Sequence, residues 1–244
     1  MTIEITERQL EILLAIVQQY INTAMPVGSK SLAEEYKWGY SSATIRNEMN
    51  ILEELSFIFQ PHTSAGRVPQ EPGYREFVND IIRNLTTKPQ KILPQLLSKV
   101  AYGSWDELLE ELVTKLAKLL SNVVIISTVN GKIYHAGLTE LLKQPEFLQT
   151  ANVLPIIQLM EDRRDMFAFL QNLQFISAEK VAIYIGKEHI FQSLQNFTSL
   201  SSYFENQYSS MKGWVTIFGP TRLPYHKSLN LLHQLSSELE QLET

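Results

Sequence analysis

The 244-residue sequence contains no cysteine, so neither disulfide bonds nor thiolate chemistry contributes to its structure or activity. It has no run of 18 or more apolar residues, and its N-terminus lacks the basic and apolar parts of a signal peptide. These absences predict a cytoplasmic protein that makes no contact with a membrane. The length suits two domains, and a hydrophobic content of 44% supports a packed core in each.

The sequence motifs of several enzyme classes are also missing. There is no H-E-x-x-H metal site, no P-loop, no G-x-G-x-x-G dinucleotide motif and no G-x-S-x-G nucleophile motif. The five histidines are scattered without metal-ligand spacing. We therefore predict no catalysis, no cofactor and no metal site. The segment Gly219 to Arg222 is an anion-site candidate before a helix, although a structural strand-to-helix turn is the favoured interpretation.

Positive charge is scarce where a DNA-binding function would need it. The net charge is −5, and residues 1–88 hold eight Lys and Arg against eleven Asp and Glu. A DNA-binding domain is usually basic. Any contact with DNA must therefore depend on a few well-placed side chains rather than on a broad basic surface.

The N-terminal segment has the start and stop signals of a helix. Thr6 and Gln9 form a T-x-x-Q capping box, which predicts a helix that begins directly after Thr6. Pro26 and Gly28 end it. Between these signals, apolar residues follow at helical spacing, namely Leu10, Leu13, Leu14, Val17 and Ile21.

Two more helices and a hairpin are predicted next. Ser29 is placed to cap a helix that runs to about Tyr36, and Gly39 is free to take a positive φ in the turn that follows. Ser41 or Ser42 caps the third helix. Residues 57–60 and 67–70 are predicted strands, joined by the polar segment 61–66 with Gly66 in a left-handed conformation. This order of elements is typical of a winged helix-turn-helix, whose third helix reads the major groove of DNA.

The candidate DNA-binding residues lie at the starts of two helices and on the hairpin. Arg46 and its neighbours face away from the apolar stripe of the third helix, and Arg67 beside the hairpin tip is placed to follow phosphates or enter a minor groove. An ordinary solvated helix face and a plain surface hairpin are the structural alternatives. The full candidate set is Lys30, Ser31, Ser42, Thr44, Arg46, Asn47, His62, Thr63, Ser64 and Arg67. Three basic contacts in each subunit of a dimer predict a log–log salt slope of about −5.

A second domain is predicted after a linker, with residues 1–85 as the first domain, 86–103 as the linker and 104–244 as the second domain. Ser104 and Glu107 form a capping box for a helix, and Asn130-Gly131 is a hairpin dipeptide. Strands are predicted at 122–129, 132–135, 181–185 and 214–218. Helices are predicted at about 74–85, 139–149, 153–171 and 225–242. The leucines of the last helix are assigned to the core, with a dimer seam as the alternative, and they are Leu232, Leu235, Leu239 and Leu242. Together they indicate an α/β domain with one antiparallel sheet.

Several of these segments resemble one known family. The segments PVGSKSLAEEY, SSATIRNEMNILEEL, QPHTSAGRVP and GYREFV, together with the more loosely matching IYHAGLTELLKQPEF, VAIYIGKEH and GPTRLPY, are similar to the heat-inducible transcription repressor HrcA family. The resemblance implies an α+β protein with an N-terminal winged helix-turn-helix and a GAF-like α/β domain. It also implies a homodimer that represses chaperone genes by binding double-stranded DNA at an inverted-repeat operator, tuned by a GroEL-type chaperonin. The family's dimerising insertion is missing between Val129 and Gly131.

A one-component regulator that senses a small molecule through its second domain is the alternative function. His135, His189 and His226 are candidates for a polar pocket in that domain. A pocket with convergent polar groups favours the sensor, whereas an interior filled by Ile, Leu and Phe side chains removes its main support.

Overall fold

A computed structural model describes residues 5–84, 93–96, 104–149, 152–174 and 180–243. The chain divides into two compact units, residues 1–84 and 85–244. Most of the predicted linker, residues 86–103, lies outside the described residues, and α5 (Leu93–Leu96) is the part of it that the structure describes. Within the described ranges, no helix combines the length and the apolar character that crossing a membrane requires.

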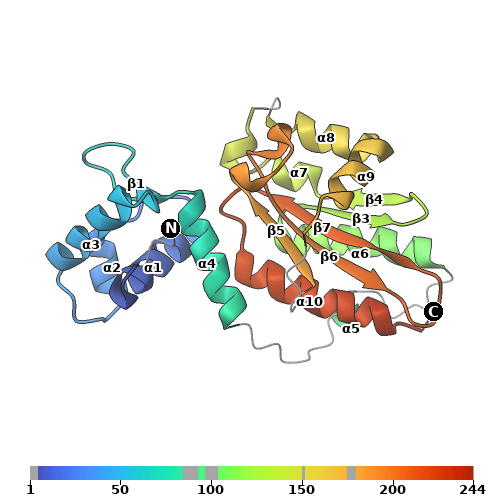
Figure 1. The fold of residues 1–244 in the computed structure, drawn as a ribbon, viewed down its shortest axis with the longest axis horizontal. Coiled ribbons are helices and arrows are strands. Elements are labelled where there is room, and N and C mark those ends of the chain that lie inside the picture. Colours follow the sequence, from blue (N-terminus) through green and yellow to red (C-terminus); the bar gives the residue numbers. More distant parts are fainter. Residues whose placement is uncertain (1–4, 85–92, 97–103, 150–151, 175–179, 244) are drawn as a thin grey trace. The chain divides into compact units, whose positions relative to one another are not determined.

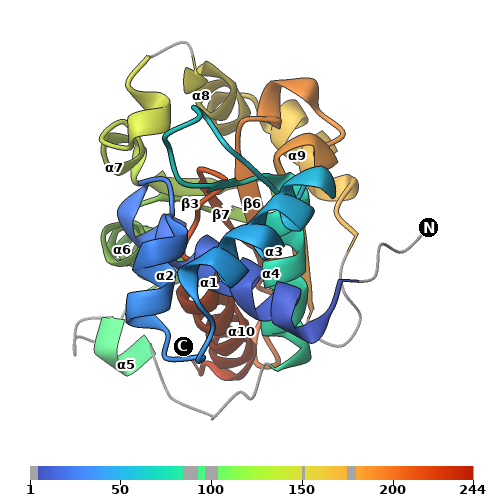
Figure 2. The ribbon, with the colours of Figure 1, turned by 90° about the vertical axis from the view of Figure 1, so that its left-hand side faces the viewer.

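The described residues of unit 1, 5–84, form four helices and one hairpin, in the order that the sequence predicts. Helix α3 packs against α1 and α2, and α4 packs against α1 (Figure 2). The loop between the two strands projects away from the helices (Figure 1). The elements are α1 (Glu7–Thr23), α2 (Ser29–Glu35), α3 (Ser42–Glu54), β1 (Ile58–Phe59), β2 (Val68–Pro69) and α4 (Glu71–Arg83).

The helix starts of unit 1 follow the predicted caps in two of three cases. The capping box of α1 is confirmed, with the Thr6 N–H donating to Gln9 Oε1 at 2.9 Å and the Gln9 N–H donating to Thr6 Oγ1 at 3.2 Å. Ser41 caps α3, because its Oγ accepts from the Thr44 N–H at 3.0 Å. The prediction for α2 is wrong: Gly28 is the N-cap, and Ser29 is the first helical residue and is buried.

The hairpin is tied to the rest of unit 1 through Val27. Strands β1 and β2 are antiparallel, and the backbones of Val27 and Arg67 exchange two hydrogen bonds of 2.8 Å each. Gly66 is not in the left-handed region, so that prediction is wrong. Position 66 requires a glycine for a steric reason instead, because a Cβ atom there would lie 2.4 Å from the carbonyl carbon of Val27. Gly39 does take a positive φ, of 80°, as predicted.

Unit 2 is built on one antiparallel five-stranded sheet with the order β4-β3-β7-β6-β5. The strands β3 and β4 form the predicted hairpin, with Gly131 at φ 83° and only residues 129–132 between them. The strands are β3 (Val123–Thr128), β4 (Ile133–Ala136), β5 (Val181–Ile185), β6 (Thr198–Glu205) and β7 (Lys212–Gly219).

Strand β6 has no counterpart in the sequence prediction. Its first half, Thr198 to Ser202, is rich in small hydroxyl residues, which locally favour turns and loops. In the structure β6 is a central strand between β5 and β7, its Thr198, Ser199, Ser201 and Ser202 side chains are buried, and Ser201 Oγ lies 2.9 Å from Thr216 Oγ1 of β7. The Ser201 hydroxyl is thus paired across the sheet, in a segment whose local sequence favours a turn or loop.

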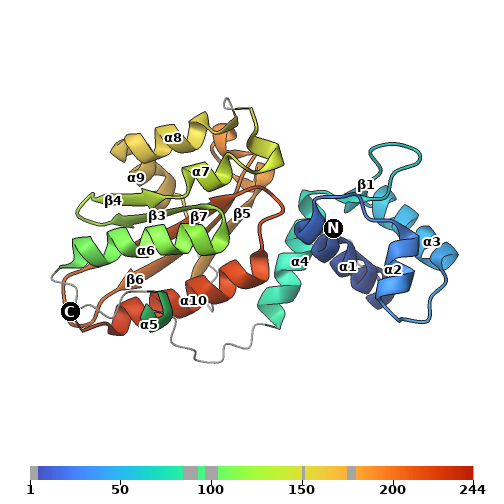
Figure 3. The same cartoon turned by 180° about the vertical axis from the view of Figure 1, so that it is seen from behind.

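Helices cover both faces of the sheet (Figures 1 and 3). Helices α6 (Trp105–Leu120) and α10 (Tyr225–Gln241) lie on one face. On the other face lie α7 (Leu138–Leu141), α8 (Leu154–Glu161) and α9 (Arg163–Gln171), with the short 3-10 helices η1 (Pro145–Phe147), η3 (Gly186–Glu188) and η4 (Gln192–Leu194). The leucines of α10, Leu232, Leu235 and Leu239, are buried in the core as predicted.

Two predicted helices are shorter than expected. The helix predicted at 139–149 ends at Leu141, and Pro145 then begins a separate 3-10 turn. The helix predicted at 153–171 is interrupted at Asp162, whose carboxylate accepts from the Arg164 N–H at 2.7 Å and caps α9. A capping side chain in the middle of an apolar periodic segment thus restarts the helix.

Candidate nucleic-acid interface

An open hollow in unit 1 gathers half of the predicted site residues. It lies between the start of α2, the outer face of α3 and the hairpin loop, and its lining includes Lys30, Arg46, Thr63, Ser64 and Arg67. Three segments that are separate in the sequence therefore present polar side chains to one space. The remaining predicted residues lie outside the lining of the hollow.

The outer face of α3 is polar and exposed at the helix start. Ser42, Arg46 and Asn47 are exposed, whereas Ile45 and Met49 face the core. The separation follows the helical period, as the sequence predicts. Among the described residues, neither Lys30 nor Arg46 forms an ion pair within the protein. Both charges are thus available to an external anion such as a phosphate.

The hydroxyl groups of Ser31 and Thr44 are engaged within the protein. The Ser31 hydroxyl donates to Gln19 Oε1 at 3.1 Å, and Gln19 Nε2 donates back to Ser31 Oγ at 3.0 Å. Ser31 therefore fastens α2 to α1, and we remove it from the candidate set. The Thr44 hydroxyl lies 2.9 Å from Ser41 Oγ and remains half-buried at the start of α3. His62 is exposed on the hairpin tip.

Arg67 is placed differently from the sequence expectation. The residue is only 8% exposed, its Nε lies 2.9 Å from Glu53 Oε2, and its Nη2 donates to Asn50 Oδ1 at 2.9 Å. The guanidinium therefore joins the hairpin to α3 and is not free to follow a phosphate chain or enter a minor groove. The physical reason is that Glu53, near the end of α3, supplies a carboxylate that pairs with the Arg67 guanidinium.

Glu53 and Gln60 shape the hairpin loop, although no sequence motif marks either residue for this role. Glu53 Oε1 accepts from the Gln60 N–H at 2.8 Å. The Gln60 side chain donates to the carbonyl oxygens of Thr63 at 3.1 Å and Ala65 at 2.8 Å. The hairpin loop and α3 are thus connected through one carboxylate and one amide.

Glu48 is a second residue whose role in positioning α3 was not among the sequence-based expectations. It is 6% exposed, its Oε1 lies 2.6 Å from Arg8 Nη2, and its Oε2 accepts from Gln9 Nε2 at 3.0 Å. The signal was available, because Glu48 lies on the same helix face as Ile45 and Leu52, and a carboxylate among core residues requires partners. This contact fixes α3 to the first turn of α1.

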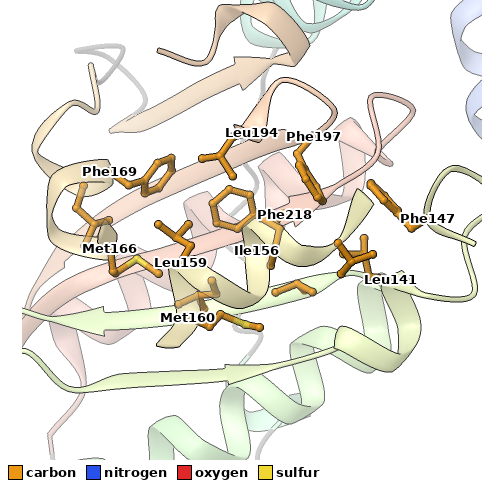
Figure 4. Close-up of a cluster of buried hydrophobic side chains, with 14 residues drawn as sticks. Leu141, Phe147, Ile156, Leu159, Met160, Met166, Phe169, Leu194, Phe197 and Phe218 are labelled. Carbon is orange, nitrogen blue, oxygen red and sulfur yellow. The ribbon is translucent and has the colours of Figure 1, made fainter. Parts of the chain in front are cut away.

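The interior of unit 2 is occupied by apolar side chains. Between the sheet and helices α7 to α9, Phe147 stacks on Phe197 with ring centroids 4.8 Å apart, and Phe169 contacts Phe218 at 5.3 Å. Figure 4 shows these rings with the leucine, isoleucine and methionine side chains around them. Such filling removes the main support for the small-molecule sensor.

The histidines proposed for a polar pocket do not share one environment. His135 and His226 are exposed, whereas His189 is 3% exposed beside the ring of Tyr184. Burial lowers the pKa of His189 to about 4, against a smaller opposing effect of Glu188. In the described ranges no three His, Asp or Glu side chains are grouped to hold a metal ion.

The segment Gly219 to Arg222 is a structural turn, as favoured by the sequence analysis. Arg222 Nε donates to Glu146 Oε1 at 2.6 Å, and Nη2 donates to Glu146 Oε2 at 3.1 Å and to Gln144 Oε1 at 2.6 Å. The guanidinium is therefore already paired with a carboxylate. It fixes the start of α10 to the segment around η1.

Comparisons with known proteins agree with this fold and assign the family. Residues 73–229 match the family model described as the HrcA protein C terminal domain. The chain belongs to the HrcA family. A heat-inducible transcription repressor HrcA from Synechococcus sp. (strain JA-2-3B'a(2-13)) is 28% identical over 98% of this chain and 99% of its own length. Another of that name, from Gloeobacter violaceus (strain ATCC 29082 / PCC 7421), is 27% identical over 95% of this chain and 92% of its own length.

A solved structure shows the same fold. It is described as a crystal structure of a hypothetical protein at 2.2 Å resolution, and it has a TM-score of 0.79 and 21% identity, covering 97% of this chain and 99% of that one. The Synechococcus alignment extends over 385 positions, more than this chain's 244 residues, so that relative carries long segments that this chain lacks.

Proposed function

We propose that unit 1 is a winged helix-turn-helix and that the chain is a transcription repressor that binds DNA. In this proposal α3 enters the major groove, with Ser42, Thr44, Arg46 and Asn47 at base edges or the adjoining phosphates. The hairpin is the wing. The observation that carries the proposal is the hollow in which Lys30 and Arg46, both without an internal ion pair in the described chain, meet the hairpin loop.

The electrostatics of unit 1 support this orientation. Glu48 and Glu53, two of the acidic residues of α3, are neutralised internally by Arg8 and Arg67. Neither glutamate lines the hollow. The few basic groups that remain, with His62, Thr63 and Ser64 on the loop, are suited to the phosphates that flank a groove contact.

The proposed operator and partners rest on the likeness to the family. The relatives are named heat-inducible transcription repressors. We infer that this chain represses heat-shock and chaperone genes, that two copies bind one inverted repeat, and that a GroEL-type chaperonin tunes its activity. The four residues between β3 and β4 leave no room there for an inserted dimerising segment. Dimerisation accordingly uses another surface of this chain.

A reporter gene under a chaperone promoter that carries the inverted repeat tests the proposal. Expression of the chain should silence the reporter at low temperature, and heating should restore it. The double variant Lys30→Ala/Arg46→Ala should fail to repress at equal protein level. Lys187→Ala, which removes an exposed charge from unit 2, is the matched control and should repress normally. Repression that the double variant retains in full would argue against the hollow as the DNA-binding surface.

A further inference from the structure

Asn50 lies on the outer face of α3, one helical turn beyond Arg46, and its side chain is exposed. Its Oδ1 accepts a hydrogen bond from Nη2 of the buried Arg67 at 2.9 Å. A guanidinium has donors only, so the amide must turn its oxygen toward Arg67. The Nδ2 amino group is thereby directed away from Arg67, and no described residue accepts a hydrogen bond from it.

The orientation of this amide is fixed by its surroundings. Arg67 is anchored by Glu53 at 2.9 Å and by the two backbone hydrogen bonds between Arg67 and Val27. A flip of the Asn50 amide would place its amino group against the guanidinium and leave a buried donor unpaired. Asn50 is therefore a donor that is set in place before any ligand arrives.

We propose that Asn50 determines sequence specificity by donating from Nδ2 to an acceptor atom on one base edge in each half-site. This inference rests on the proposed function, in which α3 enters the major groove. Guanine O6 and N7, adenine N7 and thymine O4 are acceptors there, whereas cytosine N4 is a donor that repels the amino group. Arg67 is a positioning residue, because it acts through the orientation of Asn50 and does not touch the DNA.

The test measures base preference at every position of the half-site. The full-length chain first selects its operator duplex from a random pool, and each base pair is then substituted in turn. Asn50→Ala should bind the selected duplex about 25-fold more weakly, because one hydrogen bond worth about fivefold is lost in each of the two half-sites. It should also lose its preference at one base pair in each half-site while preferences elsewhere remain.

Asn50→Asp gives the sharper result. Aspartate keeps an oxygen for Arg67 but presents acceptors only, so it should favour base edges with an amino donor, cytosine N4 or adenine N6, at that same base pair. Arg67→Met should weaken the preference at this position alone. A general structural defect produces neither change, and thermal melting of each variant checks the fold.

Two outcomes would overturn the inference. If both Asn50 variants keep the wild-type preference at every base pair, Asn50 does not read a base, while the proposed function stands. If the wild-type chain selects no sequence at all, the proposed function and this inference fail together.

Discussion

Arg67 Nε lies 2.9 Å from Glu53 Oε2, so the arginine of the hairpin is paired with the end of α3 rather than presented to solvent. Glu53 also accepts from the backbone of Gln60 at the start of the hairpin loop. One carboxylate therefore holds both ends of the loop. The position of the hairpin on α3 is consequently a property of the free protein.

Arg67→Met should lower the free energy of unfolding by about 1–3 kcal/mol, because it leaves the Glu53 carboxylate and the Asn50 amide without their charged partner. Urea denaturation of the full chain measures this change. Arg46→Met, at an exposed position of the same unit, is the control and should change stability by no more than about 0.5 kcal/mol. Unchanged stability with lost DNA binding would return Arg67 to the set of direct contacts.

The salt dependence of DNA binding should be shallow. With Arg67 paired internally, Lys30 and Arg46 are the remaining basic contacts, four in a dimer, and the log–log slope should be about −4. Lys30→Ala removes two of the four, so its slope should be about −2. Titrations at several salt concentrations give both values. An identical slope for the variant would exclude Lys30 from the phosphate contacts.

Gly66→Ala should destabilise unit 1 by about 1–3 kcal/mol, because the added methyl group would lie 2.4 Å from the Val27 carbonyl carbon and force the hairpin from its place. Gly28→Ala is the matched control, since a Cβ atom there meets nothing within 4 Å, and it should cost less than about 1 kcal/mol. Chemical denaturation compares the two variants. Equal costs would show that the close approach to Val27 relaxes freely.

His189 should make the stability of unit 2 depend on pH. Its pKa is about 4 in the folded chain, because the ring is buried, and about 6.5 when unfolded. Above pH 6.5 the ring is neutral in both states and has no effect. As the pH falls from 6.5 to 4, the unfolded state binds the proton first, and about 3 kcal/mol of stability is lost.

Denaturation curves between pH 7.5 and 4.5 measure this loss, with the interval set by the two pKa values. His189→Gln removes the titrating group and should flatten the profile. His135→Gln, at an exposed position, should leave the wild-type profile unchanged. If His189→Gln and wild type lose stability in parallel, another group is responsible.

Local signals in the sequence were sufficient for much of unit 1. The capping box of Thr6 and Gln9, the cap at Ser41 and the turn at Gly39 each depend on residues within a few positions of one another. Such contacts are encoded by the local sequence alone. The outward face of α3 likewise follows from helical periodicity.

Contacts between distant segments were not predictable in the same way. Arg67 pairs with Glu53 and Asn50 because the hairpin folds back on α3, and no local pattern indicates that return. Strand β6 is recognisable only through its backbone pairing with β5 and β7. The turn that begins at Pro145 is stabilised by the contact of Glu146 with Arg222, and these two residues are 76 positions apart in the sequence.

The most direct test of the central claim is a comparison of dissociation constants for the inverted-repeat duplex and a scrambled duplex, with the stoichiometry of each complex. The account predicts two chains per repeat and binding to the repeat at least about 10³-fold tighter. Arg46→Ala should lose about 1–3 kcal/mol for each half-site of the repeat if the guanidinium contacts a guanine. Equal weak binding of the wild-type chain to both duplexes would contradict the proposal that α3 and its hairpin read DNA.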